Sequence, residues 1–143
     1  MLWSDRADAS RLGFSTESMK NNGFTLRKRL RSFRYAGHGI RDLFREDNAR
    51  IHAVVAVAVI ATGMWLGLSL TEWAVIALTI GAVLAAEAVN TALESLCDLV
   101  SPGFDEHIRR AKDLAAGAVL LLAIASIAVG LFIFLPKLCA IAA

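Results

Sequence analysis

The chain has 143 residues, 57% of them hydrophobic, with a mean hydropathy of +0.57 and a formal net charge of +2. A soluble core of this size cannot hide so much apolar surface, so the composition excludes an ordinary soluble globular domain. We predict one all-α integral membrane domain over residues 24–143, preceded by a loosely ordered tail over residues 1–23.

The first predicted element is a basic amphipathic helix over about residues 24–46. Arg and Lys fall largely between apolar positions that recur at steps of three and four, namely Leu26, Leu30, Phe33, Gly37, Ile40 and Phe44. This pattern is typical of a helix that lies on an anionic membrane surface. In one interpretation the helix only carries the charges that set topology. In the other it also lines a site for an anionic ligand.

Three apolar segments follow, each close to the roughly 20 residues that a spanning helix needs. They cover about residues 51–70, 73–98 and 113–135, with a tight turn at residues 70–73 and a stop at Pro136 and Lys137. Most Lys and Arg residues precede Ile51 or lie between the second and third segments. The positive-inside rule therefore predicts a cytoplasmic N-terminus and a cytoplasmic second loop.

The second apolar segment carries acids on one face. On a helix of about 100° per residue, Glu87, Glu94 and Asp98 fall within a sector of roughly 40°, with Asn90 to one side. An ionised carboxylate that faces lipid costs about 2.5 to 3.5 kcal/mol, so we expect this face to meet a helix interface or a wet cavity. A purely structural alternative is a polar seam between helices, or acids paired with the basic residues of the N-terminal helix.

Carboxylates in register also suit a divalent cation. Mg²⁺ is usually held by one or two carboxylates together with nucleotide phosphates, and Lys112 and the basic helix flank the same end of the segment. No GxxxxGK[ST] sequence and no GxGxxG after a strand occurs, which excludes a P-loop or Rossmann nucleotide site. Any phosphoryl transfer would use carboxylate-held Mg²⁺ and basic side chains, with Glu87, the deepest acid, as candidate general base.

Residues 87–98, EAVNTALESLCD, with Ala111, Lys112 and Asp113 at the right distance, resemble the signature of the prokaryotic diacylglycerol kinase family. The resemblance extends from about Arg31 to Lys137. Residues 50–52, 71–73 and 98–102 are similar to the undecaprenol kinase branch of that family. The resemblance implies a homotrimer with active sites shared between chains, which phosphorylates a membrane lipid alcohol with ATP. Undecaprenol, giving undecaprenyl phosphate, is the expected substrate, and diacylglycerol, giving phosphatidic acid, is the alternative.

The resemblance also implies roles for single residues. Glu87 matches the general base, and Glu94 and Glu46 match the acids that hold Mg²⁺ against the ATP phosphates. The stretch from Gly39 to Glu46 is about one residue shorter than the usual pattern, which leaves Asp47 as a substitute for Glu46. The other nucleotide-site positions are Asn90, Asp98, Lys112 and Asp113 and, with weaker matches, Lys28, Arg31 and Tyr35.

A bacterial inner-membrane location follows from the resemblance, with the active site on the cytoplasmic side. The expected partners are ATP, the lipid alcohol, the membrane and further copies of the chain, and no nucleic acid. A rival from another class is a small proton-coupled transporter in which an intramembrane glutamate binds a cationic drug. That rival accounts for one buried acid, but not for three in register beside Lys112 and Asp113.

Overall fold

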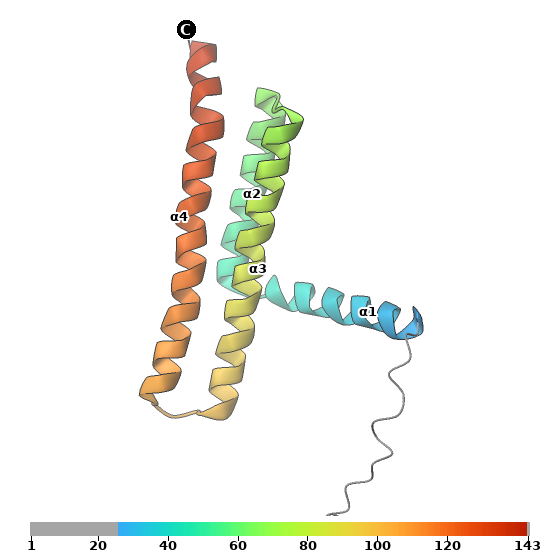
Figure 1. The fold of residues 1–143 in the computed structure, drawn as a ribbon, viewed down its shortest axis with the longest axis vertical. Helices are drawn as coiled ribbons and strands as arrows, with labels where there is room; N and C mark the ends of the chain where they lie inside the picture. Colours follow the sequence, from blue (N-terminus) through green and yellow to red (C-terminus); the bar gives the residue numbers. More distant parts are fainter. Residues whose placement is uncertain (1–25, 143) are drawn as a thin grey trace, which may run out of the picture. The chain divides into compact units, whose positions relative to one another are not determined.

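The computed structural model describes residues 26–142, which form four α-helices and no strand (Figure 1). α1 spans Leu26–Leu43, α2 spans Asp47–Leu66, α3 spans Leu70–Val100 and α4 spans Glu106–Ala142. The all-α prediction is confirmed. The tail predicted over residues 1–23, and the first two residues of the predicted surface helix, lie outside the described residues.

The helix α1 crosses a division of the chain into two compact units, which falls between Arg34 and Tyr35. The side chains of α1 are exposed along its length, and only Leu43 is buried. Its exposed apolar row, which includes Leu30 and Phe33, runs beside a basic face, as expected of a helix on an anionic membrane surface. The domain boundary at residue 24 is not tested and stays a prediction.

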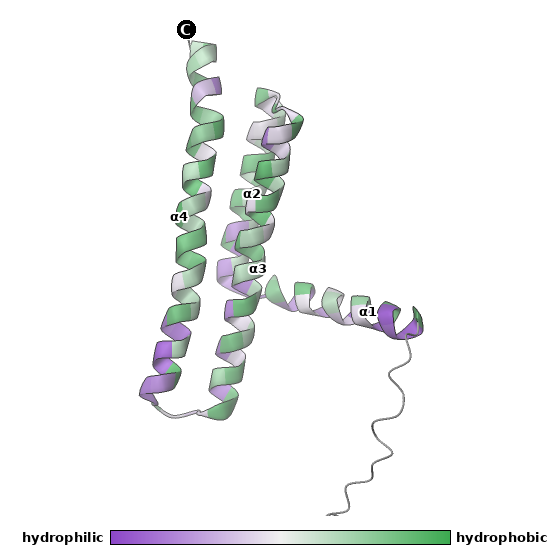
Figure 2. Cartoon of the chain, in the orientation of Figure 1, coloured by the Kyte–Doolittle hydropathy of each residue, from purple (hydrophilic) through white to green (hydrophobic). Residues whose placement is uncertain are grey.

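The helices α2, α3 and α4 form the apolar part of the molecule, and each is long and apolar enough to cross a membrane. They pack on one another, and hydrophobic residues make up most of each helix (Figure 2). Large side chains point outward, with Leu78 76% and Phe132 81% exposed. Such a surface belongs against lipid, so the prediction of three membrane spans is confirmed.

The turn between α2 and α3 comes earlier than predicted. α2 ends at Leu66, Gly67 has a left-handed backbone with φ 65° and ψ 60°, and α3 already begins at Leu70. A capping box explains this start. The Ser69 hydroxyl accepts from the Glu72 backbone N–H at 3.3 Å, and the Glu72 carboxylate accepts from the Ser69 backbone N–H at 2.7 Å. Residues 70–73, predicted as the turn, are therefore the first turn of α3.

Replacing Gly67 tests how far this turn depends on the left-handed backbone. Nothing lies within 4 Å of a Cβ added there, so Gly67→Ala strains only the backbone. We expect Gly67→Ala to lower the free energy of unfolding by about 1 to 2 kcal/mol. Titration of the protein from mild detergent into a denaturing one measures the change. Gly81→Ala is the matched control, since it also meets nothing within 4 Å but lies inside a helix and is not expected to destabilise. Equal effects of the two changes would contradict this account.

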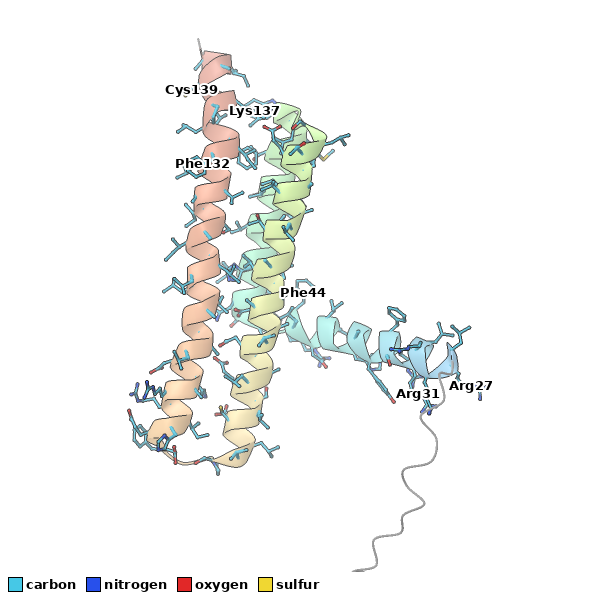
Figure 3. All side chains as sticks on the ribbon, viewed as in Figure 1. Arg27, Arg31, Phe44, Phe132, Lys137 and Cys139 are labelled. Carbon is cyan, nitrogen blue, oxygen red and sulfur yellow. The ribbon has the colours of Figure 1, made fainter. Side chains whose placement is uncertain are left out.

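α4 is longer than predicted at both ends. It begins at Glu106 because the Asp105 carboxylate accepts from the backbone N–H groups of His107 and Ile108, at 2.8 and 3.1 Å. The stop predicted at Pro136 is wrong, because the helix continues to Ala142. Proline removes one backbone hydrogen bond, which a helix in an apolar environment tolerates. Lys137, labelled in Figure 3, then pairs with Glu72 at 3.2 Å and ties α4 to the first turn of α3.

The lengths of the helices place the acidic residues. α2 has 20 residues, so it is about 30 Å long and matches the hydrocarbon thickness of a bilayer. α3 starts at the adjoining turn but has 31 residues, so residues 90–100 extend about 16 Å past the beginning of α2. Figure 1 shows α3 and α4 continuing together in this extension. Of the three acids on the polar face of α3, Glu87 therefore lies level with α2, whereas Glu94 and Asp98 lie beyond its beginning.

Candidate functional site

The side chains on the acidic face of α3 are buried at Glu87 and become more exposed toward Asp98. The Glu87 side chain is buried, with 2% of its surface exposed, and Asn90 is 5% exposed. Glu94 is half-buried and Asp98 is exposed. No hydrogen bond or ion pair within the described residues involves the Glu87 carboxylate. The face thus joins an isolated interior carboxylate to groups that water-borne ligands can reach.

Asn90 orients Glu94. Its side-chain amide nitrogen donates to Glu94 Oε1 at 3.1 Å. A carboxylate can only accept, so the amide nitrogen must face Glu94 and the amide oxygen must point elsewhere. That oxygen, Asn90 Oδ1, is buried and has no partner within residues 26–142. The pair therefore holds one carboxylate in place and keeps one acceptor free for a donor.

Asp98 and Lys112 join α3 to α4 at the open end of the face. Lys112 Nζ donates to Asp98 Oδ1 at 2.9 Å, and the two side chains are 36% and 68% exposed. The residues are far apart in sequence, so this pair results from the antiparallel packing of the two helices. An ammonium group held beside carboxylates at a water-accessible position can bind a phosphate oxygen.

Arg109 is a charged residue of this region that the sequence analysis missed. Its Nε and Nη2 donate to Glu106 Oε2 and Oε1, at 3.0 and 2.5 Å, and its Nη1 pairs with Asp113. Asp113 is thus oriented by a neighbour on its own helix. The signal was available, because residues three and four apart on a helix are adjacent on its surface.

Glu46 and Asp47, the two candidates for a second metal-holding acid, have different surroundings. Glu46 precedes α2 with an extended backbone, and its exposed side chain makes no capping hydrogen bond. The Asp47 carboxylate is engaged by Arg50 at 2.9 Å. Of the two, Glu46 has the available carboxylate. No hydrogen bond or ion pair joins Glu46 to α3 within the described residues.

Three weaker candidates, Lys28, Arg31 and Tyr35, have exposed side chains on α1. Lys28 and Arg31 precede the division between the two units, and Tyr35 directly follows it. The structure therefore brings together Asn90 with Glu94 and Asp98 with Lys112.

The donor set on α3 fits a magnesium ion that is completed by other oxygens. Within residues 26–142, no group of three or more His, Cys, Asp or Glu side chains could hold a metal ion. Mg²⁺ does not need one, since it is commonly held by one or two carboxylates plus phosphate oxygens and water. The oriented Glu94 carboxylate meets the first of these requirements.

A family model described as prokaryotic diacylglycerol kinase matches residues 34–134, which include α2, α3 and most of α4. The chain belongs to the prokaryotic diacylglycerol kinase family. The match contains Glu46 and the whole polar face of α3, and it starts after Lys28 and Arg31.

Three relatives of the chain are named as lipid kinases, in agreement with the family model. An undecaprenol kinase of Bacillus subtilis is 42% identical over 120 residues, covering 83% of this chain and 98% of the relative. A diacylglycerol kinase of Synechocystis is 44% identical over 132 residues, covering 91% of this chain and 75% of the relative. A diacylglycerol kinase of Sinorhizobium is 30% identical over 92 residues, covering 64% of this chain and 67% of the relative. The chain is a lipid kinase, and the transporter interpretation is set aside.

Proposed function

We propose that this chain transfers the γ-phosphoryl group of ATP to the hydroxyl of undecaprenol and so makes undecaprenyl phosphate. One observation carries the proposal: the sealed Glu87 carboxylate and the open Asp98–Lys112 pair lie on the same face of α3, with Asn90 and Glu94 between them. In this proposal the lipid hydroxyl meets the first from the apolar side, and ATP meets the second from water.

Glu87 acts as the general base in this proposal. It takes the proton from the lipid hydroxyl as that oxygen bonds to the γ-phosphorus. The bond from the γ-phosphorus to the bridging oxygen breaks, ADP leaves, and Glu87 later returns the proton to water. Burial supports this role, because a carboxylate without a partner among residues 26–142 is available to accept a proton.

The other residues hold the nucleotide. Glu94, oriented by Asn90, and Glu46 would hold Mg²⁺, which when bound neutralises charge on the triphosphate. Lys112 binds phosphate oxygens. Asp98 holds the Lys112 ammonium in place, and Asp113 holds the Arg109 guanidinium. Lys28, Arg31 and Tyr35 on α1 add contacts to the nucleotide. Positioning and charge neutralisation supply most of the catalysis of phosphoryl transfer, so this set is chemically sufficient.

We also propose that the active form is a homotrimer whose sites are shared between chains, with the N-terminus and the active site on the cytoplasmic side of a bacterial inner membrane. Glu46 makes no hydrogen bond or ion pair with α3 within the described residues, which is compatible with a site completed by a neighbour. The clustering of Lys and Arg before Ile51 and between α3 and α4 supports the orientation.

Competition between lipid alcohols tests the substrate. Purified protein in mixed micelles, supplied with ATP and Mg²⁺, receives equal mole fractions of undecaprenol and dioleoylglycerol. We expect the larger kcat/KM for undecaprenol, since the B. subtilis relative named for that activity matches over nearly its whole length. A larger kcat/KM for dioleoylglycerol would assign the chain to the alternative, which the Synechocystis relative represents.

A further inference from the structure

An apolar cavity of about 230 Å³ lies among α2, α3 and α4. All three helices contribute to its wall. The apolar lining side chains include Val55, Val59, Ile76, Val83, Ile127 and Phe134. The cavity is partly open, so a long molecule can enter it and still continue into surrounding lipid.

The polar groups of the cavity are nearly all satisfied by their own helices. The Thr79 hydroxyl donates to the Val75 carbonyl at 2.8 Å, and the Ser126 hydroxyl donates to the Ala123 carbonyl at 2.7 Å. His52 is the exception, because its ring nitrogens have no hydrogen-bond partner within the described residues. The cavity therefore offers apolar walls and one group that can bind a polar atom.

Its place in the bundle relates the cavity to Glu87. Val83 lines it and lies four residues before Glu87, on the same face of α3. Counting back from the α2–α3 turn puts His52 about level with Leu84, so the polar group of the cavity is at the end nearer Glu87. Glu94 and Asp98 follow Glu87 in the opposite direction along α3. Glu87 thus separates an apolar cavity from a charged surface.

We propose that this cavity binds the segment of the lipid alcohol next to its hydroxyl group, with His52 donating a hydrogen bond to the hydroxyl oxygen. The inference rests on the proposed function. A donor on the oxygen leaves the hydroxyl proton for Glu87, and the charged end of α3 stays free for the nucleotide. His52 is here a positioning residue for the substrate.

The volume of the cavity limits what it recognises. Pockets that enclose a drug-sized ligand measure roughly 300 to 1,000 Å³, so 230 Å³ can hold only a short part of a long lipid. The remaining chain lies in the bilayer, where its length makes no difference to binding. Selectivity among alcohols is then decided within the first few carbons of the chain, so a shorter prenol with the same head segment is an equally good substrate.

Filling the cavity tests the proposal. A Cβ added at Gly130 meets only the Phe134 ring, at 4.0 Å, so Gly130→Leu puts its side chain into the cavity without a backbone clash. We expect the KM for the lipid alcohol to rise about tenfold or more, with the KM for ATP unchanged. Gly117→Leu is the matched control, since Gly117 is on the same helix, has nothing within 4 Å and does not line the cavity. Gly130→Ala, a smaller filling, is expected to give an intermediate rise.

The other measurements separate this inference from the kinase proposal. Wild-type protein is expected to phosphorylate geranylgeraniol and undecaprenol with the same kcat/KM at equal mole fraction in micelles. His52→Phe is expected to raise the lipid KM and leave the ATP KM unchanged. An unaltered lipid KM in Gly130→Ala and Gly130→Leu, or equal rises in the lipid and ATP KM values, would overturn the inference while kinase activity stands. Absence of wild-type lipid phosphorylation would instead remove the kinase proposal itself.

Discussion

We expect Glu87→Gln to lower kcat by about 10²- to 10⁴-fold, which is the range that general acid–base catalysis contributes. The amide fills the same space as the carboxylate but cannot take the proton of the lipid hydroxyl. Folding should survive, because the change removes a charge from a side chain that is 2% exposed and has no ion-pair partner in the part of the chain that the structure describes. The KM for ATP should change little. Steady-state phosphorylation of undecaprenol in mixed micelles measures both constants.

Glu72→Gln is the matched control for this change. Glu72 lies on the same helix, at the end remote from the polar face, and Gln can replace Glu in a capping box. We expect near-normal kcat in Glu72→Gln. If Glu87→Gln retains the kcat of Glu72→Gln, Glu87 is not the base and the proposed mechanism fails at its first step.

Glu94→Gln is expected to lower kcat/KM for ATP by about 10²- to 10³-fold, the usual cost of removing one group that stabilises transition-state charge. The physical reason differs from that for Glu87, because Glu94 is proposed to hold Mg²⁺ against the triphosphate. The Mg²⁺ concentration that gives half-maximal rate should therefore rise in Glu94→Gln and stay normal in Glu87→Gln. Titrating activity with MgCl₂ at fixed ATP measures this difference.

Asp42→Asn is a suitable control for Glu94. Asp42 is an exposed carboxylate in an ion pair with Arg45 at 2.9 Å, and such surface pairs contribute little. Its replacement should leave the Mg²⁺ dependence unchanged. A normal Mg²⁺ midpoint in Glu94→Gln, accompanied by loss of activity, would show that Glu94 acts in another way.

The helices could be predicted from sequence because a bilayer imposes a simple rule on length and apolarity. Their ends could not be predicted as well. Ser69 and Glu72 start α3 through a reciprocal cap, whereas residues 70–73 had been assigned to the turn between two apolar segments. Pro136 was taken as a stop, although a single lost backbone bond does not end an apolar helix.

The candidate site, too, could be predicted from sequence only in part. Periodicity placed Glu87, Glu94 and Asp98 on one face, and the structure adds how far each is buried. The pairing of Asp98 with Lys112 depends on the register between α3 and α4, which no single segment contains. The role of Arg109 could have been read from its spacing to Glu106 and Asp113. Which acids hold Mg²⁺ remains a prediction from the family resemblance.

The transfer of label from γ-labelled ATP to undecaprenol tests the central claim most directly. Full-length protein in mixed micelles is incubated with both substrates, in Mg²⁺ or in excess chelator, and the lipid fraction is separated and counted. The account predicts labelled undecaprenyl phosphate in the same molar amount as ADP, and only when Mg²⁺ is present. Folded protein that leaves the lipid unlabelled in Mg²⁺, or that labels it equally in chelator, would contradict the account.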